Sequence, residues 1–281
     1  MNTVEFSILV WVGSLAAGFL GSLTGLGGGV VIVPLLTVAF GVDIRYAIGA
    51  SLISVIATSS GAAAAYVKEG YSNIRVGMFL EIATTVGALS GAFIAVYLHG
   101  HWIAVVFGVV LAYSAYLSFQ RHRDAHGESG PDGMATFLRM DSTYPDAAAA
   151  GGVKAYHVRG VPGGFGLMFV AGVLSGILGI GSGAVKVLAM DQAMHLPFKV
   201  STTTSNFMIG VTAAASAGVY LDRGYIDPGL AMPVVLGVLL GSLLGSRVLG
   251  GAKTRVLRIV FAVVIGFLAI EMIYNGVTGR I

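Results

Sequence analysis

An apolar stretch of this chain is interrupted by the sequence Gly25-Leu26-Gly27-Gly28-Gly29, and a second is interrupted by Gly179-Ile180-Gly181-Ser182-Gly183. The two interruptions lie 154 residues apart. A glycine in a helix interior costs about 1 kcal/mol relative to alanine, so we expect both helices to break here. Two glycine breaks at one offset in an apolar chain predict a duplicated membrane unit, as in secondary transporters.

The rest of the chain repeats at the same offset. Because the offset stays constant, no insertion separates the two copies between the matching points. We therefore divide the chain into a first membrane repeat at 1–119, a linker loop at 120–161 and a second membrane repeat at 162–281. The further matches are Tyr66, Gly70, Tyr71, Gly87 and Gly91 with Tyr220, Gly224, Tyr225, Gly241 and Gly245.

The composition is that of a polytopic membrane protein. Only 10% of the residues are charged and 56% are hydrophobic, whereas a soluble domain carries about 25% charged residues. The chain has no cysteine, which excludes disulfides, thiolate metal sites and cysteine nucleophiles. No basic stripe interleaved with aromatic residues indicates binding to nucleic acid.

The apolar segments fall into two length classes. A spanning helix needs about 20 residues, and the segments 47–67, 76–98 and 102–119 approach or exceed that length, as do their counterparts in the second repeat. The segments next to the breaks are shorter. We therefore expect an all-α membrane protein in which each repeat is a glycine-broken pair of short helices plus three spanning helices. The short segments are 6–20, 30–40, 165–178 and 184–194.

The lysines and arginines predict the topology. If each short pair forms a hairpin, each repeat crosses the membrane an odd number of times and the two repeats are inverted. Twelve of the 16 basic residues then lie on one side, and only Arg45, Arg223 and Arg280 lie on the other. The positive-inside rule then predicts periplasmic termini and a cytoplasmic 120–161 loop. The glycines and prolines of this loop indicate a linker with little fixed structure.

These residues resemble a known family. The stretch from Gly18 to Gly29, followed by Val33-Pro34, is similar to the opening motif of the TauE/SafE sulfite exporter family, and the stretch from Gly176 to Gly183 is similar to its repeat. Ala47 to Leu52 and Ser201 to Asn206 also match the pattern. The resemblance implies transport of small sulfur-containing anions, such as sulfite, sulfoacetate or sulfolactate, across the bacterial cytoplasmic (inner) membrane.

The glycine breaks are candidate anion sites. Each break exposes backbone amides, and the helix that restarts after it points its positive end at the same place. The alternative is that these glycines serve helix packing, because small residues at every fourth position also occur at helix contacts. The candidate substrate-binding residues of the two breaks are Gly27, Gly28 and Gly29 in the first repeat and Gly181, Ser182 and Gly183 in the second.

Lys186 is the most informative single residue. It follows the second break among apolar residues, at a position where the first repeat has Ile32. A charge at bilayer depth costs about 2.5–3.5 kcal/mol or more, so Lys186 should face a cavity or a partner. Three interpretations stay open: a counter-charge for an anionic substrate, a structural ion pair with Asp191 or Glu81, or a side chain that snorkels to the membrane surface.

Polar side chains inside the spans provide further candidates. Ser51, Ser205 and Asn206 could donate hydrogen bonds to a sulfonate, whose oxygens only accept; the alternative is helix capping and contact between helices. Glu81 and Asp191 are candidate proton-coupling carboxylates. For Glu81 the alternative is an interfacial pair with Arg75 or Lys68, and for Asp191 it is a solvated loop edge.

These observations favour a secondary transporter of a small anion, driven by an ion gradient, the membrane potential or the substrate gradient. The alternatives are a passive anion channel, an intramembrane enzyme and an assembly protein. The spans contain no His/Glu metal pattern and no Gly-x-Ser-x-Gly motif, so we expect no catalytic residue, metal ligand or cofactor. The expected partners are the lipid bilayer, the anion and a coupling proton or sodium ion, but no nucleic acid; a homodimer is left open.

Overall fold

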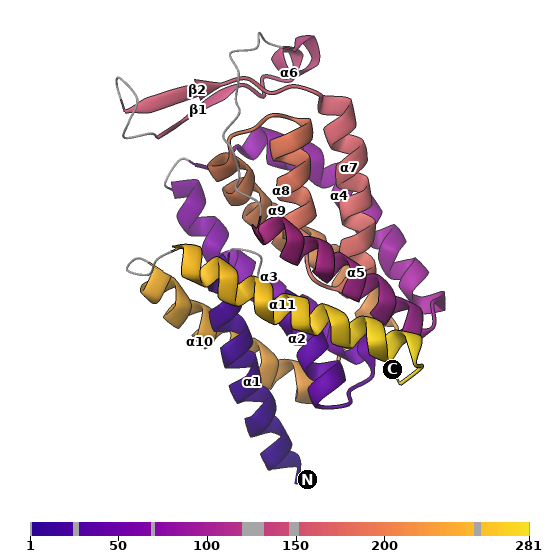
Figure 1. The fold of residues 1–281 in the computed structure, drawn as a ribbon. Helices are drawn as coiled ribbons and strands as arrows, with labels where there is room; N and C mark the ends of the chain where they lie inside the picture. The colour runs from indigo at the N-terminus through magenta and orange to yellow at the C-terminus, as the bar shows by residue number, and fades with distance from the viewer. Residues whose placement is uncertain are drawn as a thin grey trace.

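The computed structural model describes residues 2–24, 28–68, 71–119, 132–145, 152–249 and 254–280. Helices make up most of this part, and a small element with two strands lies at one end, away from both chain ends (Figure 1). In chain order the elements are α1 Thr3–Thr24, α2 Gly29–Pro34, η1 Leu35–Ala39, α3 Ile44–Lys68, α4 Ile74–Tyr97, α5 Gly100–Phe119, α6 Gly133–Phe137, β1 Ser142–Pro145, β2 Val153–Tyr156, α7 Val161–Leu178, α8 Gly183–Leu188, η2 Ala189–Ala193, α9 Phe198–Asp222, α10 Pro228–Leu249 and α11 Thr254–Val277, where η1 and η2 are π-helical.

Several helices are suited to a bilayer. Among the described residues, four are long and apolar enough to cross it: Val4–Gly21, Ile74–Tyr97, Val161–Leu178 and Pro228–Gly245. Large apolar side chains also remain exposed at helical spacing along α4, where Met78, Ile82, Val86 and Phe93 are all more than half exposed. Such a surface suits lipid better than water. The chain is therefore a multi-pass helical membrane protein, as the composition predicted.

One expectation about the broken pairs is wrong. We expected both helices of each pair to be short, but α1 has 22 residues, about 33 Å at 1.5 Å per residue. The helix starts at Thr3 and continues past the apolar segment 6–20 to Thr24. Gly18 inside it serves packing, because a methyl group on it would overlap the carbonyl of Val238 on α10. α7 is likewise long, with 18 residues. Only the second member of each pair is short, at six residues each for α2 and α8 before the π-helical turns.

The helices of the two halves correspond element by element. The starts of α2, η1, α3, α4 and α5 lie 154 residues before those of α8, η2, α9, α10 and α11. Contacts between the halves correspond in the same way. Gly241 on α10 packs against the carbonyl of Leu15 on α1, and Gly87 on α4 packs against that of Phe169 on α7. The first helix of each half, α1 or α7, therefore packs against a helix of the other half, and the two close contacts are equivalent.

The central helices α3 and α9 run antiparallel. Gly49, near the start of α3, packs against the carbonyl of Tyr225, just after α9. Thr203, near the start of α9, donates a hydrogen bond of 3.0 Å to the carbonyl of Tyr71, just after α3. These two contacts are equivalent, because each residue pair is shifted by the same offset. An approximate twofold axis perpendicular to both helices therefore relates them.

The linker is more ordered than its composition indicated. Its described residues form α6 and an antiparallel hairpin in which Ser142 pairs with Tyr156. Ala135, Met140 and Tyr156 are buried in an apolar cluster that also contains residues of α4 and α9. The expectation of little fixed structure is therefore wrong for these residues, since apolar side chains anchor them; 120–131 and 146–151 lie outside the described residues. We call residues 132–145 and 152–160 the cap.

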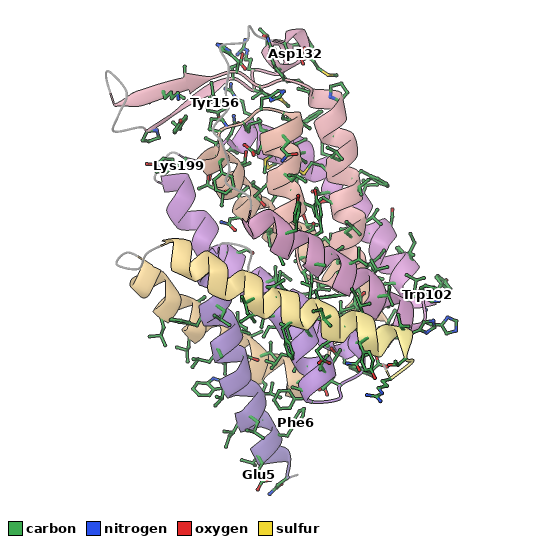
Figure 2. The ribbon with its side chains drawn as sticks, in the orientation of Figure 1. Glu5, Phe6, Trp102, Asp132, Tyr156 and Lys199 are labelled. Atoms are coloured by element: carbon green, nitrogen blue, oxygen red, sulfur yellow. The ribbon has the colours of Figure 1, made fainter. Side chains whose placement is uncertain are left out.

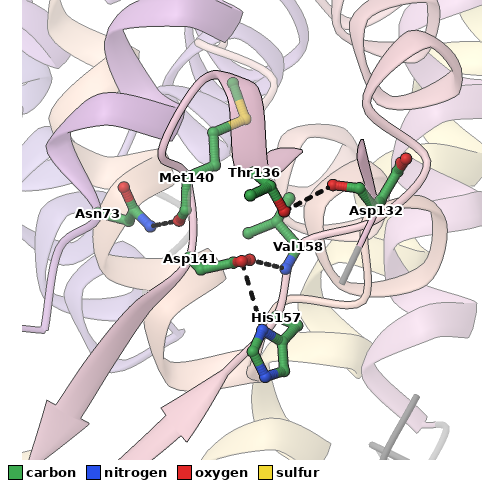
Figure 3. A network of polar contacts seen from close by, with 7 residues as sticks. All are labelled: Asn73, Asp132, Thr136, Met140, Asp141, His157 and Val158. Atoms are coloured by element: carbon green, nitrogen blue, oxygen red, sulfur yellow. Dashed lines mark hydrogen bonds and ion pairs between the residues drawn. The ribbon is translucent and has the colours of Figure 1, made fainter. Parts of the chain in front are cut away.

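Asn73 joins the cap to the helices (Figure 3). Its amide nitrogen donates to the Met140 carbonyl and to the Tyr156 hydroxyl, both at 2.8 Å, while its Oδ1 accepts from the Val76 amide at the start of α4. Burial raises the pKa of the Tyr156 phenol, so it stays protonated at neutral pH. The Asn73 side chain therefore closes the N-terminus of α4 and holds the cap at two points, Met140 before β1 and Tyr156 in β2.

The cap also holds itself together through Asp141. This carboxylate accepts a hydrogen bond of 2.8 Å from the Val158 amide, and His157 Nδ1 lies 3.3 Å from its Oδ2 (Figure 3). Asp132 caps α6, and Thr136 donates back to the Asp132 carbonyl at 3.0 Å. These local bonds explain why a glycine- and proline-rich segment adopts a defined conformation.

We predict that Asn73→Ala releases the cap. The change removes a helix cap, worth about 1 kcal/mol, and leaves the Met140 carbonyl and the Tyr156 hydroxyl without their partner. Hydrogen exchange in 132–145 and 152–160 should accelerate at least tenfold. The matched control is Asp227→Ala at the equivalent start of α10, where the carboxylate accepts from the Gly229 amide at 2.8 Å. Equal exchange of the cap in both variants would contradict the prediction.

Candidate functional site

The helix breaks of the two halves meet beside α3. Ser51 Oγ donates to the Gly179 carbonyl at 2.8 Å and lies 3.4 Å from the Gly29 carbonyl oxygen. A methyl group on Gly29 would lie 3.5 Å from the Gly179 oxygen, and Val55 packs against both Gly29 and Gly181. One serine and one valine of the first half therefore contact both breaks.

The second break has the conformation that its glycines predicted. Gly179, Gly181 and Ser182 have φ values of 67°, 69° and 43°, in the left-handed region that favours glycine. Ser182 is held there by its hydroxyl, which donates to the Ala171 carbonyl at 2.6 Å. The predicted break between α7 and α8 is therefore confirmed. In the first half α2 starts at Gly29, after the buried Gly28, while Gly27 lies outside the described residues.

The hydroxyl groups predicted to bind substrate lie at the breaks. Ser205 Oγ donates to the Gly183 carbonyl at 3.3 Å, which is the equivalent of the contact between Ser51 and Gly29. Ser51 thus satisfies the Gly179 carbonyl, which the end of α7 leaves without a helical partner, and each serine also lies against the first carbonyl of a restarting helix. Asn206 is half-buried, and its amide has no hydrogen-bond partner in the described part of the chain. Substrate binding by these three residues stays a prediction.

Lys186 lies at the centre of a buried polar chain. Its side chain is 0% exposed, and its Nζ donates to Thr212 Oγ1. The same oxygen lies 2.7 Å from Glu81 Oε1. The chain therefore links α8, α9 and α4. Of the two structural partners considered for Lys186, the structure brings Glu81 to it through Thr212, whereas Asp191 lies half-buried in η2.

Glu81 faces the interior and not the interface. It is 7% exposed, and Thr85 Oγ1 lies 3.3 Å from its Oε1. Within the described residues, its buried Oε2 has no hydrogen-bond partner. Arg75, which could have been its partner, donates to the Arg139 carbonyl at 3.0 Å; the Lys68 side chain lies outside the described residues. In the part of the chain that the structure describes, no group of three His, Cys, Asp or Glu side chains could hold a metal ion.

The charged chain occurs in only one half. The positions equivalent to Lys186, Thr212 and Glu81 are Ile32, Thr58 and Val235. The sequence indicated Lys186 and Glu81, because a charge in an apolar segment is conspicuous. It gave no signal for Thr212, since a threonine in a helix is common and its role depends on how α4 packs against α9.

Both ends of the bundle carry a matching contact between the halves. The guanidinium of Arg45 lies 5.7 Å from the centre of the Tyr225 ring, and Lys199 Nζ lies 6.0 Å from the centre of the Tyr71 ring. The two pairs are equivalent by the same offset. Lys199 lies at the end that carries the cap with Tyr156, whereas Trp102 lies away from it (Figure 2).

These features define a class, the helical membrane transporters with internal repeats and broken helices. The sequence pattern of the family described as Sulfite exporter TauE/SafE matches residues 10–272. The chain therefore belongs to that family, which confirms the resemblance stated above.

Relatives support the same assignment. The chain is 28% identical to the Probable membrane transporter protein YunE of Bacillus subtilis (strain 168), over 98% of this chain and 99% of that protein. It is 26% identical to a Probable membrane transporter protein of Xylella fastidiosa (strain 9a5c), over 96% of each chain. No solved structure matches the chain significantly. The protein is a multi-pass membrane transporter of this family.

We predict that Lys186→Met destabilises the protein by about 3–5 kcal/mol at neutral pH. The change leaves the buried Glu81 carboxylate without a compensating charge, so it must either stay charged or take up a proton. The loss in free energy of unfolding should become smaller as the pH falls, because protonation removes the uncompensated charge. Thermal unfolding in detergent measures the loss. Adding Glu81→Gln should restore most of it, whereas adding Asp191→Asn should not; rescue by Asp191→Asn alone would show that the pairing is wrong.

Proposed function

We propose that this protein is a secondary transporter that moves a small sulfur-containing anion, such as sulfite or a sulfonate, across the bacterial cytoplasmic membrane. The observation that carries the proposal is Lys186, a fully buried ammonium group placed just after a helix break. Its Nζ has one hydrogen-bond acceptor, Thr212, among the described residues. An ammonium group has three donors, so two remain for the oxygens of an anion.

The substrate would bind between Lys186 and the two breaks. Side chains in a helix lean toward its N-terminus, so the ammonium is carried back toward the break at Gly181–Gly183. Ser51 and Ser205 would exchange their carbonyl partners for substrate oxygens. The half-buried Asn206 amide would add a donor from the next turn of α9. We assign Gly28 and Gly29 to the same site because Ser51 contacts both breaks.

The two repeats would be inverted in the membrane. The antiparallel arrangement of α3 and α9 supports this topology, because a twofold axis perpendicular to spanning helices lies in the membrane plane. The charge count supports the same orientation, with the cap in the cytoplasm and both termini in the periplasm. The domain boundaries proposed from the sequence, 1–119, 120–161 and 162–281, correspond to this arrangement.

The matching contacts at the two ends support a carrier over a passive channel. Arg45 with Tyr225 joins the halves at one end, and Lys199 with Tyr71 joins them at the other. A cation over an aromatic ring contributes about 0.5–1 kcal/mol at an exposed site, so either pair can open at low cost. Opening one pair while the other stays closed would expose the site to one side at a time.

We predict the orientation of the cap from this topology. The chain has no natural cysteine, so single cysteines can be labelled directly. Phe137 in the cap is 85% exposed, and Tyr97 at the end of α4 is 78% exposed. In intact cells a membrane-impermeant maleimide should label Tyr97→Cys but not Phe137→Cys, and permeabilised cells should show both. Labelling of Phe137→Cys from outside would contradict the inverted topology.

We predict saturable anion flux in proteoliposomes that contain the pure protein. The test anions are sulfite, sulfoacetate, taurine, sulfate and carboxylates. The double variant Lys186→Met with Glu81→Gln should lower the flux roughly tenfold to hundredfold, because a hydrogen bond to a charged group contributes about 1.5–3 kcal/mol. We expect the double variant to keep the fold, so its rate of exchange of labelled for unlabelled anion, compared with that of Glu81→Gln alone, reports the ammonium group. Absence of flux for every anion with the unmodified protein would contradict the proposed function.

A further inference from the structure

Thr212 can direct its hydroxyl proton to Glu81, to a backbone carbonyl of its own helix or, at the longer distance of 3.5 Å, to Thr84 Oγ1. Its Oγ1 lies 2.7 Å from Glu81 Oε1 and 3.0 Å from the carbonyl oxygen of Met208, one turn earlier in α9. The same oxygen accepts a hydrogen bond from Lys186. A hydroxyl group has one proton to donate, so the acceptor that receives it depends on the state of Glu81.

With Glu81 ionised, the chain runs in one direction. Lys186 donates to Thr212, Thr212 donates to Glu81 Oε1, and the charges of the lysine and the carboxylate offset each other. When a proton binds to Oε1, the new O–H group donates to Thr212 Oγ1, and Thr212 turns its own proton to the Met208 carbonyl. The proton comes from solvent and stays on Glu81, and no other bond changes.

We propose that Glu81 is the proton-binding site of this transporter and that Thr212 couples its protonation to anion binding at Lys186. The inference rests on the proposed function and adds the coupling ion. A neutral Glu81 leaves the buried charge of Lys186 without compensation, which favours an anion beside it. Because coupling between two ligands is reciprocal, a bound anion equally favours the protonated form of Glu81. Anion and proton therefore cross in the same direction.

Among the residues that the structure describes, the surroundings of Glu81 leave Lys186 as the charge that faces it. α7 carries no titratable side chain, and the titratable residues of α9 lie near its two ends. On α4 itself, Arg75 is bonded to the Arg139 carbonyl, while in the cap Tyr156 is bonded to Asn73. Within the described residues the buried Oε2 of Glu81 has no partner, so half of the carboxylate is not stabilised in its ionised form.

The repeat supplies a matched control. Thr58 is the equivalent of Thr212 in α3, and within the described residues its hydroxyl bonds only to carbonyls of its own helix, those of Ser54 and Val55. The positions equivalent to Lys186 and Glu81 are Ile32 and Val235. Thr58→Val and Thr212→Val therefore remove the same atom from equivalent helices, and only the second change touches the charged chain.

The test uses proteoliposomes with labelled sulfoacetate outside and a pH-sensitive dye inside. With the unmodified protein, an inward proton gradient should drive accumulation of sulfoacetate, and a sulfoacetate gradient should acidify the lumen. Glu81→Gln mimics the protonated state. It should retain exchange of labelled for unlabelled sulfoacetate, while accumulation and acidification fall at least tenfold. Thr212→Val should also lose accumulation, and Thr58→Val should behave as the unmodified protein does.

Three results would overturn the inference. The first is gradient-driven accumulation by Glu81→Gln, and the second is sulfoacetate flux through the unmodified protein that ignores the proton gradient. Either would leave the proposed function intact. The third needs no variant: sulfoacetate binding to the solubilised protein without proton uptake, measured by calorimetry in buffers of different ionisation enthalpy. Failure of every anion in the panel to cross would instead overturn the proposed function, and the coupling with it.

Discussion

The buried ammonium of Lys186 is the constraint on which the packing of α4, α8 and α9 depends. A charge without solvent contact is stable only beside a compensating group, and here Thr212 and Glu81 provide it. That arrangement requires α4, α8 and α9 to meet at one point. It also requires α8 to start again after a break, because a continuous helix from α7 would carry Lys186 away from α9.

The two halves share a scaffold but not its chemistry. Matching glycines let α1 approach α10 and let α7 approach α4, so the backbone contacts are made twice. The buried charge is present once, since Ile32 and Val235 occupy the equivalent positions of the first broken pair and its partner helix. Under the proposed function, the symmetric scaffold would supply two equivalent end states, and the asymmetric charge would give one place at which a proton and an anion are linked.

Glycine has two separate roles in this chain, and spacing alone does not distinguish them. Gly18 lies inside α1 and permits the close approach of Val238, whereas Gly179 has a positive φ and ends α7. Both are glycines in apolar segments with further glycines nearby. The expectation that α1 and α7 would be short failed at the helix ends: α1 runs from Thr3 to Thr24, and α7 starts at Val161, beyond the apolar segments 6–20 and 165–178.

The sequence by itself determined the membrane class, the duplication, the break after α7 and the presence of unusual charges at Lys186 and Glu81. These follow from local composition and from a constant offset, which need no knowledge of packing. Only the tertiary structure decided that Glu81, and not Asp191, is linked to Lys186 and that Thr212 joins them. It also decided that the linker folds into a cap held by Asn73. Each of these depends on residues more than 60 positions apart, and no local pattern records which distant side chains will meet once helices pack.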